Sequence, residues 1–170
     1  ANHLATTLGA LASSYARSRD LDPAIALTRE AIDVLSPLAD ADPAGTFATS
    51  DLPMASVRLA SFQLAAKDPA AAIKTCEELG NRLRAILEGS PKNTSAKQWL
   101  GKALGFKAQA EHSLGKIDDE AKTLAECLAI RESFLNAGYD PYRVQRDLLP
   151  TYEGLIRVAR TRKDTAALIA

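Results

Sequence analysis

The chain is poor in the residue types that mark several classes of protein. Its 170 residues include two cysteines, one methionine and one tryptophan, and aromatic residues make up only 5%. Valine occurs four times and isoleucine eight times, against 32 alanines and 23 leucines. Because β-branched residues favour strands whereas alanine and leucine lose least in a helix, the composition predicts an all-α chain.

The chain also lacks an excess of charge of either sign and a long apolar run. It has 21 basic and 21 acidic residues, so no net field attracts a phosphate backbone or an anionic membrane surface. No apolar run approaches the roughly 20 residues that span a bilayer. We therefore expect neither nucleic acid nor a membrane as a partner.

The two cysteines, Cys76 and Cys127, have no second cysteine or histidine at metal-ligand spacing. We expect no metal and no cofactor. Two isolated thiols are typical of a reducing compartment, which predicts a cytoplasmic protein. Because the sequence opens at Ala1 and ends at Ala170 inside an apolar pattern, we expect a piece of a longer polypeptide.

Proline, glycine and aspartate divide the chain into helical segments of unequal spacing. Short breaks alternate with long ones, and a short break leaves room only for a tight antiparallel reversal. Residues 1–170 are therefore predicted to form one domain of helical hairpins, with units at about 3–40, 53–88, 95–137 and 142–170. The predicted helices cover 3–18, 22–40, 53–66, 69–88, 95–114, 118–137, 142–162 and 165 onward. Ser95 with Gln98 is typical of a helix-capping box.

A recurring order of large, small and aromatic residues relates the hairpins to one another. The first unit carries it in Leu8, Leu11, Ala12, Tyr15, Ala24, Ala31 and Ile32. The later units repeat parts of it, in Leu59, Ala60, Ala72 and Leu79, then in Leu104, Ala108, Gly115, Ala121 and Leu128, and finally in Leu155, Val158 and Ala167. This pattern resembles the tetratricopeptide repeat (TPR). The resemblance implies a right-handed superhelix, an α-solenoid of about three and a half units.

Two other architectures stay open from the sequence. Ala24, Ala72, Ala121 and Ala167 are separated by 48, 49 and 46 residues, which is nearer to the length of a HEAT or armadillo unit than to the 34 residues or so of a TPR. The second and third units have Gln63 and Glu111 where the aromatic residue belongs. A plain helical bundle is the other alternative.

Motifs for catalysis are missing. The glycine loop, the His-Arg-Asp loop and the Asp-Phe-Gly segment of protein kinases are absent, and Gly101-Lys102 lacks the rest of a phosphate loop. His112 has no neighbouring nucleophile in the sequence. We therefore expect a protein that is not an enzyme. An unrecognised active site is the alternative, and a deep pocket that joins His112 to a carboxylate would favour it.

Extended units of this kind are similar to helical segments that accompany bacterial serine/threonine kinases and other multidomain signalling proteins. The segments Ala129-Ile130-Arg131-Glu132 and Arg146-Asp147-Leu148 carry this resemblance. It implies a regulatory segment within a larger signalling protein of bacterial origin.

The predicted function is a scaffold that binds a peptide or a partner helix on its concave face, which the first helix of each unit lines. The cations and aromatic rings expected there favour an acidic segment with apolar side chains. Self-association as a homodimer is the alternative, because the open ends of a solenoid expose apolar surface. The predicted binding residues are Arg17, Arg58, Lys102, Phe106, Gln109, His112, Tyr152 and Arg160.

Overall fold

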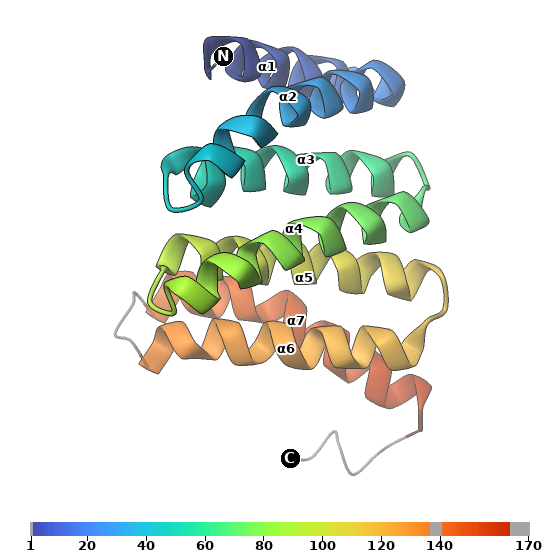
Figure 1. The fold of residues 1–170 in the computed structure, drawn as a ribbon. Helices are drawn as coiled ribbons and strands as arrows, with labels where there is room; N and C mark the ends of the chain where they lie inside the picture. The colour runs from blue at the N-terminus through green and yellow to red at the C-terminus, as the bar shows by residue number, and fades with distance from the viewer. Residues whose placement is uncertain (1, 137–140, 164–170) are drawn as a thin grey trace.

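The structure is a computed structural model that describes residues 2–136 and 141–163, and all regular elements within these ranges are helical (Figure 1). Each of the first seven predicted helices is present, with ends within a residue or two of the expected positions. The eighth, from 165 onward, lies outside the described residues. The elements are α1 (Asn2–Arg17), α2 (Leu21–Ala41), η1 (Phe47–Asp51), α3 (Leu52–Ala65), α4 (Pro69–Gly89), α5 (Thr94–Ser113), α6 (Ile117–Asn136) and α7 (Pro141–Thr161).

Tight turns after α1, α3, α5 and α7 share one backbone conformation. Each contains a residue of positive φ, and these residues are Arg19, Lys67, Gly115 and Lys163, each 48 residues after the one before. A left-handed residue just past a helix end redirects the chain and satisfies its last carbonyls. The turn recurs even where the residue is not glycine, so the hairpins repeat with a period of 48 residues over the described ranges.

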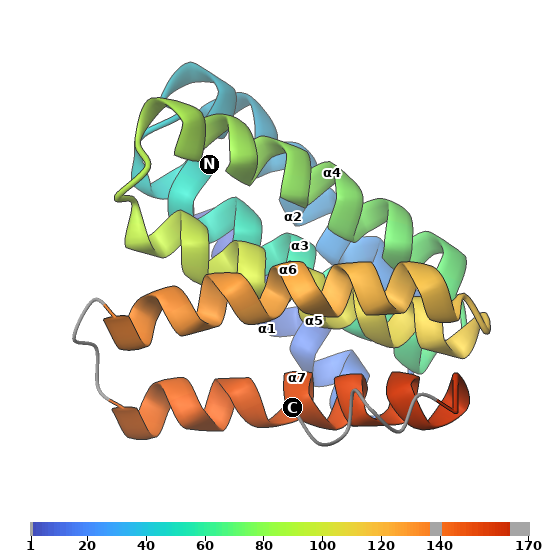
Figure 2. The ribbon, with the colours of Figure 1, turned by 90° about the horizontal axis from the view of Figure 1, so that it is seen from below.

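Helices that adjoin in the sequence pack against one another from one end of the molecule to the other (Figure 1). In addition, α3 contacts α5, and α5 contacts α7. Figure 2 shows α2 and α4 toward one side of the molecule and α1, α5 and α7 toward the other. This packing of hairpins is consistent with a helical repeat whose first helices share one face.

The small residues expected where the two helices of a hairpin approach each other are fully buried in the first two hairpins. Ala12, Ala24, Ala60 and Ala72 are each 0% exposed. Alanine permits such an approach because its side chain adds little volume and loses no rotamer freedom. These positions confirm the expected small residues of the first two units.

The register predicted for the third unit is wrong by one residue. Ala121 is only half-buried, whereas Glu120, which is 48 residues after Ala72, is fully buried. Asp118, Asp119 and Glu120 all lie in the first turn of α6, and a run of acids there is typical of a solvated helix start. For this reason the sequence alone does not distinguish the buried carboxylate of Glu120 from its solvated neighbours.

Two helix starts differ in detail from expectation. The side chain of Asn93 caps α5 by accepting a hydrogen bond from the amide of Ala96 at 3.0 Å. The hydroxyl of Ser95, expected to be the cap, instead donates to the carbonyl of Thr49 at 2.6 Å. This contact ties α5 to η1, a helical turn within a stretch that reads as a linker.

No helix among residues 2–136 and 141–163 is long and apolar enough to cross a membrane.

Enlarging Ala72 should destabilise the fold. The substitution Ala72→Leu is expected to lower the free energy of unfolding by about 1–3 kcal/mol, because a full core would have to accommodate three extra carbons. Ala121→Leu should lower it by less than Ala72→Leu does, because the side chain of Ala121 is only half-buried. Urea unfolding of both variants checks the pair, and equal losses would refute the 48-residue register.

Candidate peptide-binding face

All eight predicted binding residues lie on first helices. Arg17 is on α1, Arg58 on α3 and Tyr152 on α7. The others are Lys102, Phe106, Gln109 and His112 on α5, and Arg160 on α7. Two hollows on this face collect five of the eight.

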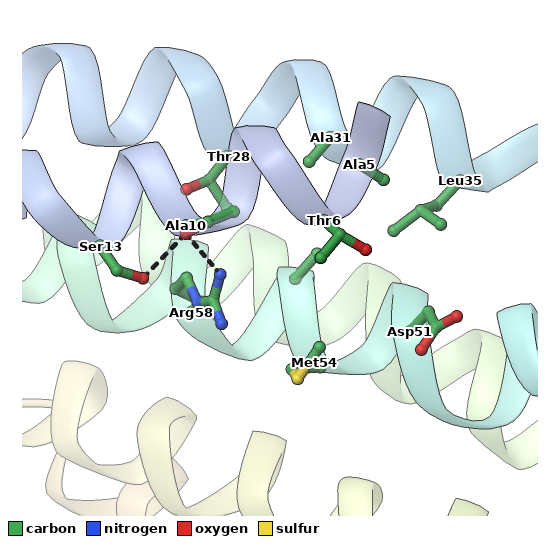
Figure 3. Close-up of a pocket in the computed structure, with 12 residues that line it drawn as sticks. Ala5, Thr6, Ala10, Ser13, Thr28, Ala31, Leu35, Asp51, Met54 and Arg58 are labelled. Atoms are coloured by element: carbon green, nitrogen blue, oxygen red, sulfur yellow. Dashed lines mark hydrogen bonds between the residues drawn. The ribbon is translucent and has the colours of Figure 1, made fainter. Parts of the chain in front are cut away.

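The upstream hollow lies between α1, α2 and α3 and has a volume of about 240 Å³ (Figure 3). Arg58 donates from Nη1 to the carbonyl of Gly9 at 2.9 Å, and the hydroxyl of Ser13 donates to the same oxygen at 2.8 Å. A Cβ on Gly9 would lie 2.6 Å from Arg58 Nη1, so glycine makes room for the guanidinium. The rest of the lining is Ala5, Thr6, Ala10, Thr28, Ala31, Leu35, Asp51, Met54 and Ala55.

The downstream hollow lies between α5, α6 and α7 and has a volume of about 440 Å³. It brings together four of the predicted residues, which are Lys102, Phe106, Gln109 and His112. The rest of the lining is Gly105, Ala108, Leu124, Arg131, Pro150, Thr151, Glu153 and Arg157.

The two hollows are the same place in the repeat, two units apart. Eight pairs of lining residues stand 96 residues from one another. The pairs are Thr6 and Lys102, Gly9 and Gly105, Ala10 and Phe106, Ser13 and Gln109, Thr28 and Leu124, Leu35 and Arg131, Met54 and Pro150, and Ala55 and Thr151. The backbone therefore forms an equivalent hollow twice, and the side chains give each copy a different chemistry.

Three predicted residues line neither hollow. Arg17 and Arg160 are exposed, and the phenol of Tyr152 donates to Glu132 Oε1 at 3.2 Å. Phe106 does line the downstream hollow, but its half-buried side chain also packs against a cluster that includes Ala60 and Cys76. Part of its ring therefore belongs to the core.

Arg131 was not predicted, because it lies on a second helix. It stands 48 residues after Leu83, which is fully buried, and 96 after Leu35. Its Nη1 donates to the carbonyl of Asp147 and, at 2.6 Å, to Thr151 Oγ1, and its Nη2 lies 3.4 Å from the carbonyl of Gly101. Once the 48-residue period is known, the sequence itself shows that Arg131 stands where the first two units have leucine, which marks it as a candidate site residue.

Glu120 joins three helices beneath the downstream hollow. Its carboxylate is fully buried, accepts a hydrogen bond from Arg157 on α7 and lies 3.1 Å from Nδ1 of His112 on α5. A buried carboxylate is tolerated only when it is paired and hydrogen-bonded in this way. Glu120 therefore connects α5, α6 and α7.

The contact between His112 and Glu120 beside the downstream hollow is the geometry that would favour an enzyme. The lining of this hollow contains no serine or cysteine. The hydroxyl in the lining, Thr151, is 1% exposed and is bonded to Arg131. No group of three metal-ligating side chains occurs within the described ranges. The lining therefore places no serine or cysteine beside the imidazole.

A second buried carboxylate lies on the other side of α5. Glu111 is 3% exposed, its Oε1 lies 3.5 Å from Lys107, and its Oε2 has no partner among the described residues. Burial raises the pKa of Glu111, and hydrogen bonding to Thr123 opposes this effect. One unit earlier, the neutral Gln63 accepts a hydrogen bond from Thr75 at 2.9 Å. Glu111 thus places an acid where the preceding unit has an amide.

Replacing Glu111 by glutamine should stabilise the fold at neutral pH. The pKa of Glu111 is higher in the folded state than in the unfolded state. This group therefore costs no stability below its unfolded pKa, and it lowers the free energy of unfolding as the pH rises from the unfolded pKa through the folded pKa. Glu111→Gln should therefore unfold like the parent near pH 4 and gain about 1 kcal/mol near pH 7. Lys107 is not left without an acid partner in the variant, because its Nζ also lies 3.0 Å from Glu77 Oε1. Urea unfolding at both pH values checks this, and a gain that does not depend on pH would contradict it.

Comparison with models of known protein families gave no match to this chain, and comparison with curated proteins gave none. The chemistry of the two hollows is therefore what indicates a function.

Proposed function

We propose that this chain is a noncatalytic protein-interaction module that binds an extended peptide or a partner helix along the face of α1, α3, α5 and α7. The observation that carries the proposal is the hollow that recurs 96 residues apart on this face. A surface with two equivalent recesses, two units apart, suits a partner that runs across successive hairpins and places side chains in both.

The proposal includes the finer architecture, a right-handed α-solenoid of about three and a half TPR-like units. Three features support it: the turn that recurs every 48 residues, the buried alanines, and the contacts of α3 with α5 and of α5 with α7. In such an array each hairpin packs on its neighbours, and the first helices line the concave side.

The wider setting stays a prediction. It comprises a cytoplasmic location, a bacterial origin and a regulatory role in a larger signalling protein. Cys76 and Cys127 are both buried as free thiols, which supports the first of these.

Self-association is the second candidate, and an exposed stripe on α7 favours it. Leu149, Tyr152 and Ile156 are 59%, 43% and 43% exposed. Their equivalents 48 residues earlier are buried, and these are Gly101, Leu104 and Ala108. The equivalent residues of the first and second units are buried as well. No described helix covers this stripe. A second copy could cover it, and it lies outside both hollows.

Peptide selection tests the proposed binding face. Peptides are selected from a random library for binding to the parent. Their affinity for the double variant Lys102→Ala/Gln109→Ala should be at least tenfold lower, because this variant lacks two exposed side chains that line the downstream hollow. The matched control is Lys74→Ala/Glu78→Ala, which removes an exposed pair from α4 and should bind like the parent. Calorimetric titration gives the affinities. Equal binding to both variants would move the site off this face.

Sedimentation separates the second candidate from the first. If the α7 stripe forms a dimer, Leu149→Lys/Ile156→Lys should turn it into a monomer, because two buried charges would oppose association. A parent that is monomeric at about 100 μM, far above a Kd expected for a specific dimer, would refute self-association.

A further inference from the structure

We propose that the downstream hollow binds the carboxylate of a glutamate or aspartate side chain in the docked segment, and that Arg131 and Lys102 are its ligands. This inference rests on the proposed function, and it names the chemistry that the partner presents at one of the two hollows.

Arg131 stands at a position of the repeat that holds an apolar side chain in the first two units. The equivalent residues Leu35 and Leu83 are 3% and 0% exposed. Both Gly101 and Gly105 of α5 face the side chain of Arg131. A Cβ on Gly105 would lie 3.3 Å from Arg131 Nη2, and a Cβ on Gly101 would lie 3.8 Å from its Nε. A Cβ on Gly105 would crowd the head group, whereas the distance at Gly101 is an ordinary contact, so it is the missing side chain of Gly105 that makes room for the cation.

The charge of Arg131 is hydrogen-bonded but not neutralised. Its acceptors are the carbonyls of Asp147 and Gly101 and the hydroxyl of Thr151, all of them uncharged. These bonds engage three of its five N–H groups. No carboxylate among the described residues lies within 4.0 Å of it. Two donors are therefore left for a ligand, which matches the two oxygens of a carboxylate.

Lys102 is the second cation without an acid partner. Its Nζ lies 4.1 Å from the centroid of the Trp99 ring, and within the described ranges no carboxylate is paired with it. A contact between a cation and an aromatic face is weak at an exposed site. A carboxylate in the hollow can therefore draw Lys102 away from Trp99.

The remaining charges around the hollow do not cancel these two cations. Arg157 and His112 are both engaged by the buried Glu120. Glu153 is the one exposed acid in the lining, so the hollow carries an excess of positive charge. Removing that acid should strengthen the attraction for an anion.

The upstream hollow differs at both ligand positions. It has Thr6 where the downstream hollow has Lys102, and Leu35 where the downstream hollow has Arg131. Its arginine, Arg58, donates to the carbonyl of Gly9 and stands at a different place in the repeat. The upstream lining has one cation, Arg58, and one acid, Asp51, whereas the downstream lining has Lys102, Arg131 and Arg157 against Glu153 alone. Only the downstream copy therefore carries an excess of positive charge.

Titration with acetylated tetraglutamate amide tests the inference, with acetylated tetraglutamine amide as the neutral probe. Calorimetry at low salt should show saturable binding of the acidic peptide alone. Arg131→Leu, which restores the residue of the equivalent positions, should weaken it at least tenfold, since a hydrogen bond between two charged groups is lost. Glu153→Gln should tighten it about twofold to threefold. Trp99 is the only tryptophan, and its fluorescence should change as Lys102 leaves the ring.

The control variant is Arg82→Leu, which removes a cation on α4 that is paired with Asp40 and should bind like the parent. If Arg131→Leu does not fold by circular dichroism, Gly105→Ala replaces it, because the added Cβ crowds Nη2. Unchanged affinity in the Arg131 variant, or equal loss in the control, would overturn the inference. So would tighter binding of inorganic phosphate than of tetraglutamate. If peptides selected for the first-helix face bind but tetraglutamate does not, the inference fails and the proposed function stands.

Discussion

The close approach of paired helices at buried small residues is the constraint on which the rest of the structure depends. Ala12, Ala24, Ala60 and Ala72 leave no exposed surface, and a left-handed residue returns the chain at the same point of each unit. Together these features fix the relative position of the two helices in each hairpin. The repeat then carries through the contacts between hairpins, and equivalent hollows open two units apart.

The third unit satisfies the same constraint by different means. It has Glu120 in place of a buried alanine, Arg131 in place of a buried leucine and Glu111 in place of Gln63. Buried charges stabilise less than well-packed apolar residues and are harmful when unpaired. Local departures from a consistent pattern tend to mark functional sites. Two of the three departures lie at the downstream hollow, which is why that hollow is assigned the more specific ligand.

The elements of the fold were predictable from the sequence because local signals determine them. Proline, aspartate and the spacing of apolar residues located the helices, and Ala24 and Ala72 located two close contacts. The third unit was misplaced by one residue because Glu120 resembles a solvated acid at a helix start. Half of the predicted binding residues line one hollow, since they share one face of α5. Arg131 was missed because it lies on a second helix, and the space beside Gly105 that admits its guanidinium is visible only once α5 is packed against α6.

Position along the repeat therefore matters more than residue type for locating the site. Chemical-shift mapping of alanine methyl groups in complex with a selected peptide tests the binding face most directly. Shifts should concentrate at Ala10 and Ala108, which line the two hollows, and spare Ala70 and Ala129, which are exposed on second helices. Shifts that concentrate at Ala70 and Ala129 instead would place the partner on the opposite face and contradict the proposed function.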